Sequence, residues 1–536
     1  MYDLIVRNGR VIDGTGAPWF RADVAVQDGR ILGVGRFADA AAAVAIDADD
    51  RFVAPGFIDI HTHSDLTLLI DGRASSTLAQ GVTTQVVGNC GVSAAPVRHG
   101  QPYYGPLDPA MTRGLVCDWE DYAGYFQRLE SQGIGTNVAA LVGHGNLRVA
   151  AMGYDDRTPT PAEMERMRQL AARAMEDGAL GLSSGLAYAP GPYAAPEEFV
   201  ELGRVVGRYG GLYTSHIRNQ TEGIAAAVGE VIAVGEAAGI AAHVSHMQPG
   251  SPMIGATREL LATLEQARRR GVDVSCDAIP YTIGSTTLKS LLPPWACDGG
   301  DEALLRRLRD PAARGRIKAD TMAHGAESGG SRKRNLAKEG RWDRIWLGSA
   351  AANAHLVGKS FVEIGRLRGQ DPHDAVLDLL LEEEARPWML AEDVSEEDFR
   401  NIASHPVGGV ISDGFSLRPE GVLGEGKHHP RSYGAFPYFL RRFVREQGAL
   451  AWEAAVHKLT GYGAARFRLP GRGLVREGAA ADLVVFDPGT VAEAADFDRP
   501  YQYPVGIDWV VVNGRLAVDR GQLQDTRSGQ VLRRAA

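Results

Sequence analysis

Short apolar runs and amphipathic stretches alternate through the middle of this chain of 536 residues. The apolar runs have the length of buried strands, and the stretches between them repeat apolar residues at helical spacing. The strand-like runs are 137–142, 212–215, 241–245 and 272–277, and the helical stretches are 161–177, 225–238 and 258–270. Repeated strand-then-helix units predict an α/β fold with a parallel sheet, most economically a (β/α)8 barrel of the TIM type.

The two ends of the chain have a different pattern, in which short alternating strands are separated by turn signals. Residues 2–53 alternate in this way, and strand-like runs return at 481–486 and 509–514. The dipeptides that favour hairpin turns near the start are Asn8-Gly9, Asp13-Gly14 and Asp28-Gly29. We expect the two ends to form one small β-sandwich domain.

These patterns divide the chain into three parts. We expect a β-domain from residues 1–54 and 471–536, and a catalytic barrel from residues 55–470. Residues 286–349 interrupt the barrel rhythm with Pro293-Pro294 and the basic run Arg332-Lys333-Arg334. Long loops in compact enzymes are often lids or substrate walls, so we expect an insertion near the barrel mouth. A solvated face is the favoured interpretation of the basic run, with a functional patch as the alternative.

Composition narrows the classes of partner. The chain is 44% hydrophobic and 23% charged, has a mean hydropathy of -0.16, and contains no apolar run long enough for a bilayer. Its net charge of -9 provides no cationic field for polyanions. We therefore expect a small-molecule substrate, with neither nucleic acid nor membrane as partner, and the oligomeric state stays open. Four cysteines and a start without the features of a secretory signal favour a cytoplasmic protein.

Two histidines spaced by one residue close the apolar run 54–60. Side chains alternate along a strand, so His61 and His63 project to the same side, and two converging imidazoles are half of a metal site. The alternative is a strand-end pair that is bonded to backbone.

Further polar residues close later apolar runs, where a parallel barrel places its active-site groups. They are His216, His246 and Asp413. His243 would point to the other side of its strand, so we interpret it as structural. Asp413 is a candidate for proton transfer beside a metal, or it caps the turn that follows.

This arrangement resembles the amidohydrolase superfamily, which has a His-x-His pair after the first barrel strand, histidines after the fifth and sixth, and an aspartate after the eighth. Many of its binuclear members bridge two metals with a carboxylated lysine. No lysine precedes Lys289 in this chain. Cys90 follows a strand-like run and lies in a glycine-rich turn, where a thiolate could bind zinc; the alternative is a buried apolar cysteine.

The chain resembles the D-aminoacylase (N-acyl-D-amino-acid deacylase) family over nearly its whole length. The matching strings occupy residues 88–91, 181–188, 215–218, 280–285, 412–414 and 429–434. By this resemblance, Cys90, His216 and His246 hold one tight Zn²⁺. His61 and His63 hold or outline a second, weaker site.

The reaction implied is zinc-dependent hydrolysis of the amide bond of N-acyl-D-amino acids, with Asp413 first as base and then as acid. The preference for D over L substrates comes from the resemblance alone. The resemblance also places Tyr281 and Arg431, with Ser285 nearby, at the substrate carboxylate. Tyr188 lines the pocket by the same analogy; for Tyr281 the alternative is a packed aromatic ring, and for Arg431 a surface ion pair.

One position departs from the family pattern. Many members have a lysine two residues after the histidine of the sixth strand, where this chain has Gln248, which is therefore a candidate substrate contact. A neutral amide binds a carboxylate more weakly than an ammonium does, so Arg218 or Arg431 could compensate. The alternative function is a related amidohydrolase acting on a dipeptide, a cyclic amide or another N-acyl metabolite. A non-catalytic scaffold is disfavoured because the whole set of candidate ligands is present.

Overall fold

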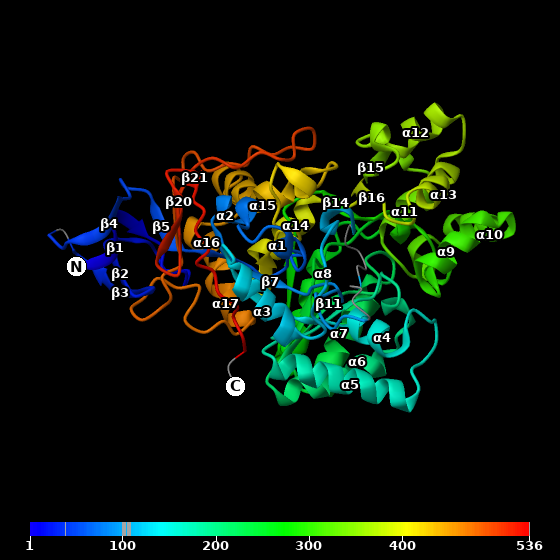
Figure 1. Cartoon of the computed structure of the whole chain (residues 1–536), viewed down its shortest axis with the longest axis horizontal. Helices are drawn as coiled ribbons and strands as arrows, with labels where there is room; N and C mark the ends of the chain where they lie inside the picture. The colour runs from blue at the N-terminus through cyan, green and yellow to red at the C-terminus, as the bar shows by residue number, and fades with distance from the viewer. Residues whose placement is uncertain (38, 99–102, 104–108, 535–536) are drawn as a thin grey trace.

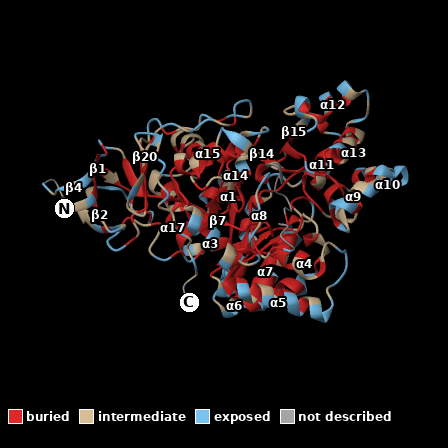
Figure 2. Ribbon diagram, in the orientation of Figure 1, coloured by how far each residue is buried: buried red, intermediate tan, exposed pale blue. Residues whose placement is uncertain are grey.

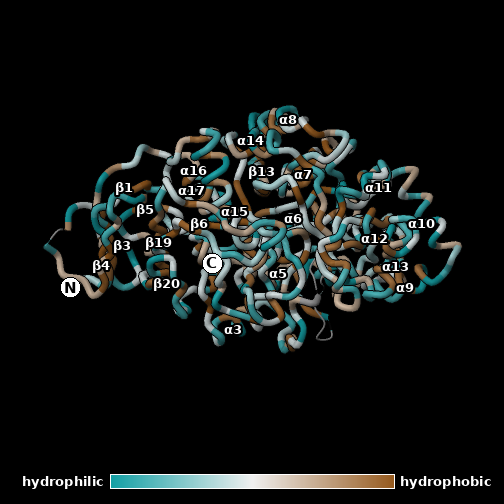
Figure 3. Tube along the Cα trace, turned by 90° about the horizontal axis from the view of Figure 1, so that it is seen from above, coloured by the Kyte–Doolittle hydropathy of each residue, from teal (hydrophilic) through white to brown (hydrophobic). Residues whose placement is uncertain are grey.

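The computed structural model describes residues 1–37, 39–98, 103 and 109–534. Three parts follow one another along the long axis of the molecule (Figure 1). A β-domain that contains the N-terminus lies at one end, a barrel lies in the middle, and a mainly helical insertion lies at the other end. Seen from above, the same order holds, with α9 to α13 beyond the barrel (Figure 3).

Parallel strands form the barrel and confirm the predicted fold. Their bounds are β6 (Phe57–Asp59), β7 (Val82–Val87), β8 (Asn137–Ala140) with β9 (Val142–Gly143), β10 (Gly181–Gly185), β11 (Leu212–His216), β12 (Ala242–Val244), β13 (Val274–Ala278) and β17 (Gly408–Val410). Strands β6, β7 and β8 pair in that order, and β9 to β13 continue to β17. A parallel bridge between Thr62 and Gly414 joins the last strand to the first. The barrel therefore closes next to His61, His63 and Asp413.

Helices cover the barrel, and most of them bury one face while the other is exposed, whereas α4 (His144–Met152) has no exposed residue (Figure 2). The others include α3 (Tyr122–Gln132), α5 (Pro161–Glu176), α6 (Pro196–Arg208), α7 (Ile224–Ala238), α8 (Thr257–Arg269) and α14 (Glu396–Ser404). Helix α5 begins with a capping box between Thr160 and Glu163, with Pro161 in its first turn. Its buried face carries Met164 and Met167, as the helical spacing of the sequence predicts. Three further helices follow the last barrel strand: α15 (Arg431–Phe439), α16 (Trp452–Leu459) and α17 (Gly461–Arg466).

The β-domain is built from both ends of the chain, as predicted. Its strands are β1 (Tyr2–Val11), β2 (Phe20–Gln27), β3 (Arg30–Gly35), β4 (Ala42–Asp47), β5 (Phe52–Pro55), β18 (Leu483–Phe486), β19 (Ile507–Val512), β20 (Arg515–Asp519) and β21 (Gln522–Leu523). They form one hydrogen-bonded sheet of nine strands. The two ends meet where β5 and β18 pair antiparallel, with Val53 opposite Val485. The domain boundaries at residues 54 and 471 stay predictions.

The turn dipeptides of the first strands have different outcomes. Asp28-Gly29 joins β2 to β3 in a hairpin, with φ of 50° and 72° at the two residues. Asn8-Gly9 is not a hairpin turn, because β1 continues through it with a register shift between Val6 and Gly9. Position 9 faces β5 so closely that an added Cβ would lie 2.4 Å from Cγ2 of Val53. The glycine is needed for this close approach to β5 and for the bulge rather than for a chain reversal.

The insertion lies between β13 and β17 and has its own core. Strands β14 (Ile283–Thr287), β16 (Trp388–Glu392) and β15 (Ile345–Ser349) pair antiparallel in that order. Its helices are α9 (Gly300–Arg309), α10 (Pro311–His324), α11 (Lys333–Lys338), α12 (Phe361–Arg368) and α13 (Pro372–Glu382). The core includes Leu304, Leu336, Phe361 and Leu380. The unit thus extends beyond the expected range 286–349, because α12 and α13 have the same helical spacing as the barrel helices.

The basic run in this insertion is not the solvated face that was expected. Arg332, Lys333 and Arg334 are all buried, at 6%, 5% and 0% exposure. Arg332 and Lys333 pair with Asp393, and Arg334 pairs with Asp320. Charge runs are buried where acids and the surrounding fold cover them, which local composition does not reveal.

Within the described part of the chain, no helix has the length and apolarity needed to cross a membrane.

Candidate metal centre and active site

The carboxyl ends of the barrel strands bring the predicted metal ligands together. Sγ of Cys90 lies 3.3 Å from Nε2 of His61, 3.4 Å from Nε2 of His246 and 3.7 Å from Nδ1 of His216. Nε2 of His63 lies 3.0 Å from Oδ1 of Asp413. Cys90 is therefore central to the group. Its sulfur contacts His216 and His246, which are predicted for the tight site, and also His61, which is predicted for the weaker site.

Four of these residues offer one ligand atom each within 4.8 Å of one another. They are His61, Cys90, His246 and Asp413, and all are buried. His216 is outside this tightest group but contacts the Cys90 sulfur. A thiolate among imidazoles is a donor set that zinc prefers, and the Asp413 carboxylate lies beside it. The residues present therefore fit the metal that the family resemblance implies.

Three members of this group have a left-handed backbone conformation that residues other than glycine rarely adopt. The φ angles are 52° at Cys90, 33° at His246 and 53° at Asp413. Each such residue costs about 1–3 kcal/mol and persists only where the surrounding structure fixes it. Around Cys90 the chain is packed tightly, since a Cβ on Gly91 would lie 2.6 Å from the backbone nitrogen of Gly185. These strained conformations lower the stability of the fold, but they direct the three side chains towards one point.

The buried carboxylate of Asp277, which the sequence analysis missed, contacts the histidines on the side away from the Cys90 sulfur. Oδ2 of Asp277 lies 2.8 Å from Nε2 of His243 and 3.7 Å from Nδ1 of His61. Its Oδ1 accepts a hydrogen bond from the backbone N–H of His246. His243, whose Nδ1 lies 2.6 Å from Oγ of Ser275, is structural, as interpreted from its strand position. Asp277 follows from the same alternation as the other strand-end residues and could have been found from it.

A second missed carboxylate joins the first barrel strand to the last. Asp59 accepts hydrogen bonds from the backbone N–H groups of His61 and Ser412, both at 3.2 Å, and from the Ser412 hydroxyl. Burial raises the pKa of the Asp59 carboxyl to about 7 against these hydrogen bonds. Asp59 thereby fixes the turn that presents Asp413.

The electrostatics of the cluster favour a thiolate and an ionised carboxylate. Burial alone would raise the pKa of the Cys90 thiol, but the His61 and His246 imidazoles hold it well below its usual range. Burial would also raise the pKa of Asp413, yet the Arg431 guanidinium and His63 hold it well below its usual range. Burial and the neighbouring His246 lower the pKa of His216 to about 4. Against the effect of burial, Asp413 and Cys90 in turn raise the pKa of His63 to about 9, and because a metal binds neutral imidazole and thiolate, metal binding at His63 would release a proton.

A narrow cavity opens onto this cluster and receives three of the five predicted substrate contacts. It has a volume of about 30 Å³, room for about two waters. Tyr188, Ser285 and Arg431 line it together with the metal-ligand candidates. Nη1 of Arg431 lies 2.8 Å from Oδ2 of Asp413, so Arg431 is a buried partner of the candidate base and not a surface ion pair.

The other two predicted contacts face elsewhere. Gln248 is fully buried, and its side-chain amide bonds both backbone groups of Ile279, at 2.9 and 3.1 Å. Tyr281 stacks on Tyr438 with ring centroids 4.5 Å apart, and it does not line the cavity. The ring of Tyr281 is thus packed, but its buried hydroxyl has no hydrogen-bond partner among the described residues, so the alternative of a packed aromatic with a bonded hydroxyl fits only in part. Gln248 was a candidate because it occupies the position of a lysine in the related family, but after the left-handed φ of 33° at His246 its amide bonds the backbone of Ile279.

Two cations from the insertion line the cavity in addition to Arg431. They are Arg332 and Lys333, which the sequence analysis assigned to a solvated face. The cavity wall opposite the barrel therefore comes from the insertion. The only signal in the sequence was the place of the basic run within a segment expected at the barrel mouth.

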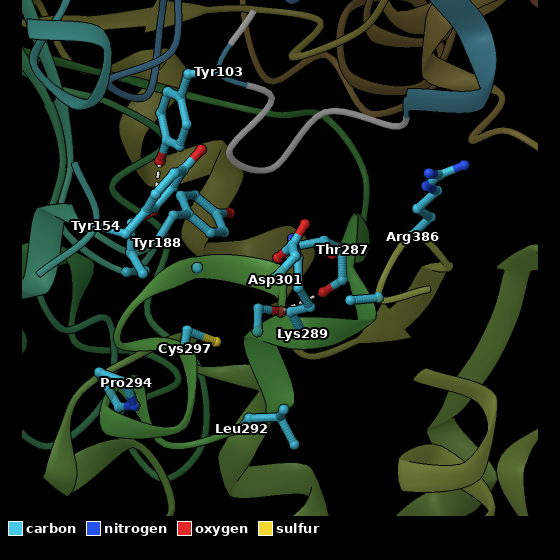
Figure 4. A pocket seen from close by; sticks show the side chains of 15 residues that line it. Tyr103, Tyr154, Tyr188, Thr287, Lys289, Leu292, Pro294, Cys297, Asp301 and Arg386 are labelled. Atoms are coloured by element: carbon cyan, nitrogen blue, oxygen red, sulfur yellow. Dashed lines mark hydrogen bonds and ion pairs between the residues drawn. The ribbon is translucent and has the colours of Figure 1, made fainter. Parts of the chain in front are cut away.

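A second cavity of about 100 Å³ adjoins the first at Tyr188, which lines both. Tyr103, Tyr154 and Tyr188 gather on one side of it, and the ion pair of Lys289 and Asp301 lies across from them (Figure 4). The Tyr188 hydroxyl lies 3.1 Å from Oγ1 of Thr286, at the boundary between the cavities. Besides the tyrosines, its lining includes the apolar residues Leu292 and Pro294 and the charged residues Lys289, Asp301 and Arg386.

Comparisons with known proteins agree with this geometry. An amidohydrolase family model matches residues 44–204 and 359–518. The D-aminoacylase of Alcaligenes xylosoxydans xylosoxydans is 35% identical over 536 residues, covering 100% of this chain and 98% of that protein. The N-acyl-D-glutamate deacylase of the same organism is 37% identical, covering 100% of this chain and 97% of that protein.

A solved structure shares the whole fold. The N-acyl-D-glutamate deacylase from Bordetella bronchiseptica, in complex with zinc and a phosphonate mimic of the tetrahedral intermediate, matches with a TM-score of 0.83. It is 36% identical and covers 99% of each chain. The strand-end ligands, the cysteine in place of a lysine and these full-length matches agree, and the chain belongs to the D-aminoacylase family of amidohydrolases.

Proposed function

We propose that this protein hydrolyses the amide bond of N-acyl-D-amino acids in a zinc-dependent reaction, releasing a carboxylate and a free D-amino acid. The observation that carries the proposal is the convergence of His61, Cys90, His246 and Asp413 within 4.8 Å at the barrel mouth. Relatives that match over the full length are named as D-aminoacylase and N-acyl-D-glutamate deacylase, which supports the substrate class and the D configuration.

Cys90, His216 and His246 would hold the tight zinc, and His61 and His63 would hold or outline the weaker site. The Cys90 sulfur contacts His61 as well as the other two histidines, which makes it the candidate ligand common to both sites. Zinc in this donor set would supply a Lewis acid for the scissile carbonyl and would lower the pKa of a water.

Asp413 would move the proton. It is ionised at neutral pH because Arg431 and His63 hold its pKa well below its usual range, so it is ready to accept a proton from the attacking water. Returning that proton to the leaving nitrogen lets the amine depart in preference to hydroxide. Tyr188 and Ser285 line the same cavity, which supports their assignment as substrate contacts.

The test is amine release from N-acetyl-D- and N-acetyl-L-amino acids by zinc-loaded protein, with Asp413→Asn as the blank. We expect turnover of the D series alone, and a loss of at least about 100-fold in the blank with its zinc content unchanged. Turnover of neither series by zinc-loaded protein would reject the proposal and favour a dipeptide, a cyclic amide or another N-acyl metabolite.

All four cysteines lie in the described residues and are free, which supports a reducing, cytoplasmic location.

A further inference from the structure

Two cations that the insertion brings to the catalytic cavity share a single carboxylate. Nε of Arg332 donates to Oδ2 of Asp393 at 2.7 Å, and Nζ of Lys333 lies 3.4 Å from the same oxygen. The three side chains are only 5%, 6% and 2% exposed. Two positive charges against one negative charge leave one buried positive charge unmatched, and such a charge is costly without a partner.

The unmatched charge faces the space where the substrate binds. Arg332 and Lys333 both line the cavity, and the anionic groups among its described lining residues are Asp413 and the Cys90 thiolate, whose sulfur contacts His61, His216 and His246. Asp413 is already paired with Arg431. At Gly284 a Cβ would lie 3.0 Å from Nζ of Lys333 and 3.7 Å from Nη2 of Arg332, so both cations reach the cavity edge over this glycine. An anionic group in the cavity would supply the missing partner.

Of the residues expected at the substrate carboxylate, Ser285 and Arg431 line the cavity, but Arg431 already contacts Asp413. Gln248 is bonded to the backbone of Ile279, and Tyr281 packs outside the cavity. Every N-acyl amino acid nevertheless carries an α-carboxylate that must be partnered when water is excluded.

We propose that Arg332 and Lys333 form the binding site for the α-carboxylate of the substrate, so that the insertion selects N-acyl amino acids over neutral amides. The inference rests on the proposed function and names its specificity-determining residues. Asp393 is the positioning residue, since it touches both cations through one oxygen from the end of β16. Lys333 supplies three donors and Arg332 a planar fork, which together suit a carboxylate.

The experiment compares Lys333→Met with wild type on N-acetyl-D-alanine and on N-ethylacetamide, the same amide without its carboxylate. For N-acetyl-D-alanine we expect kcat/KM to fall about 10- to 100-fold, mainly through KM, the range for losing a charged hydrogen bond. For N-ethylacetamide we expect less than a twofold change. Lys338→Met is the matched control, because Lys338 is on the same helix but pairs with Glu327 outside the cavity.

Gly284→Ala gives a second test that leaves every charge in place. Its added methyl group would press on the Lys333 ammonium, and we expect KM for N-acetyl-D-alanine to rise several-fold with zinc content unchanged. This variant decides the matter if Lys333→Met does not fold.

Other outcomes separate this inference from the proposed function. Equal kinetics in Lys333→Met and Lys338→Met, or an equal loss on the neutral amide, would overturn the inference while wild-type turnover upheld the function. A loss confined to N-acetyl-D-glutamate would assign the pair to a side-chain carboxylate and overturn the α-carboxylate assignment. Absence of wild-type turnover of every N-acetyl amino acid would reject both.

Discussion

Nη1 of Arg431 lies 2.8 Å from Oδ2 of Asp413, and both side chains are buried at the barrel mouth. This contact links a residue of α15 to the turn after the last barrel strand. It also sets the protonation state of the candidate base, because the guanidinium opposes the rise in the Asp413 pKa that burial would cause. The arginine thus acts on the carboxylate of the enzyme itself.

Replacing Arg431 should therefore change the pH dependence of the reaction. In Arg431→Met the pKa of Asp413 rises, so a higher pH is needed to ionise the base. We expect the acidic limb of kcat/KM to move to higher pH, measured as a full pH profile of zinc-loaded protein. Arg418→Met is the control, since Arg418 pairs with Asp71 away from the cluster. An acidic limb that stays in place would show that Arg431 does not control this ionisation.

Cys90 should be required for zinc binding. Cys90→Ser replaces a ready thiolate with a hydroxyl that stays protonated, so the site loses its central anionic ligand. We expect zinc affinity to fall by more than the roughly 10- to 100-fold that losing an outer partner costs. Competition with a metal chelator measures this, and Cys117→Ser provides a half-buried cysteine away from the cluster as control. Unchanged zinc affinity would remove Cys90 from the ligand set.

Asp277 should tune the metal site without binding the metal. It contacts His243 and accepts a hydrogen bond from the backbone N–H of His246. Asp277→Asn therefore weakens the support of these histidines while every candidate ligand remains. We expect zinc affinity to fall about 10- to 100-fold. Asp273→Asn, at a half-exposed position near the start of the same strand, should leave it unchanged. Equal affinities in the two variants would contradict a supporting role.

His373 should make the insertion sensitive to acid. Burial lowers its pKa to about 4, and neither ring nitrogen has a hydrogen-bond partner among the residues that the structure describes. Between about pH 6.5 and pH 4 the unfolded chain binds the extra proton, so stability is lost as the pH falls through this window and is constant above it. We expect the difference in unfolding free energy between wild type and His373→Leu to change by about 2 kcal/mol from pH 7 to pH 5.

Urea denaturation at the two pH values, followed by tryptophan fluorescence, checks this; the ring centroid of one tryptophan, Trp342, lies 5.3 Å from that of His373. His355→Leu, at an exposed position of the same insertion, should show no such pH dependence. A constant difference between wild type and His373→Leu would mean that this histidine is protonated equally in both states.

The sequence by itself determined the barrel, the β-domain from both chain ends and the candidate ligands. These features rest on local regularities: hydrophobic periodicity predicts strands and helices, and strand ends of a parallel barrel meet on one face. His61, His216, His246 and Asp413 each close an apolar run, so their convergence followed from topology. Cys90 was identified in the same way, supported by the lack of any lysine before Lys289.

Only the tertiary structure decided what surrounds the cluster. Gln248 comes after a left-handed residue, so the strand period no longer gives its direction, and it bonds Ile279 instead of facing the cavity. Arg332 and Lys333 form a polar run whose burial depends on Asp393, about 60 residues later in the chain. Such long-range pairing of buried charge is set by how the insertion folds over the barrel, which no local pattern encodes.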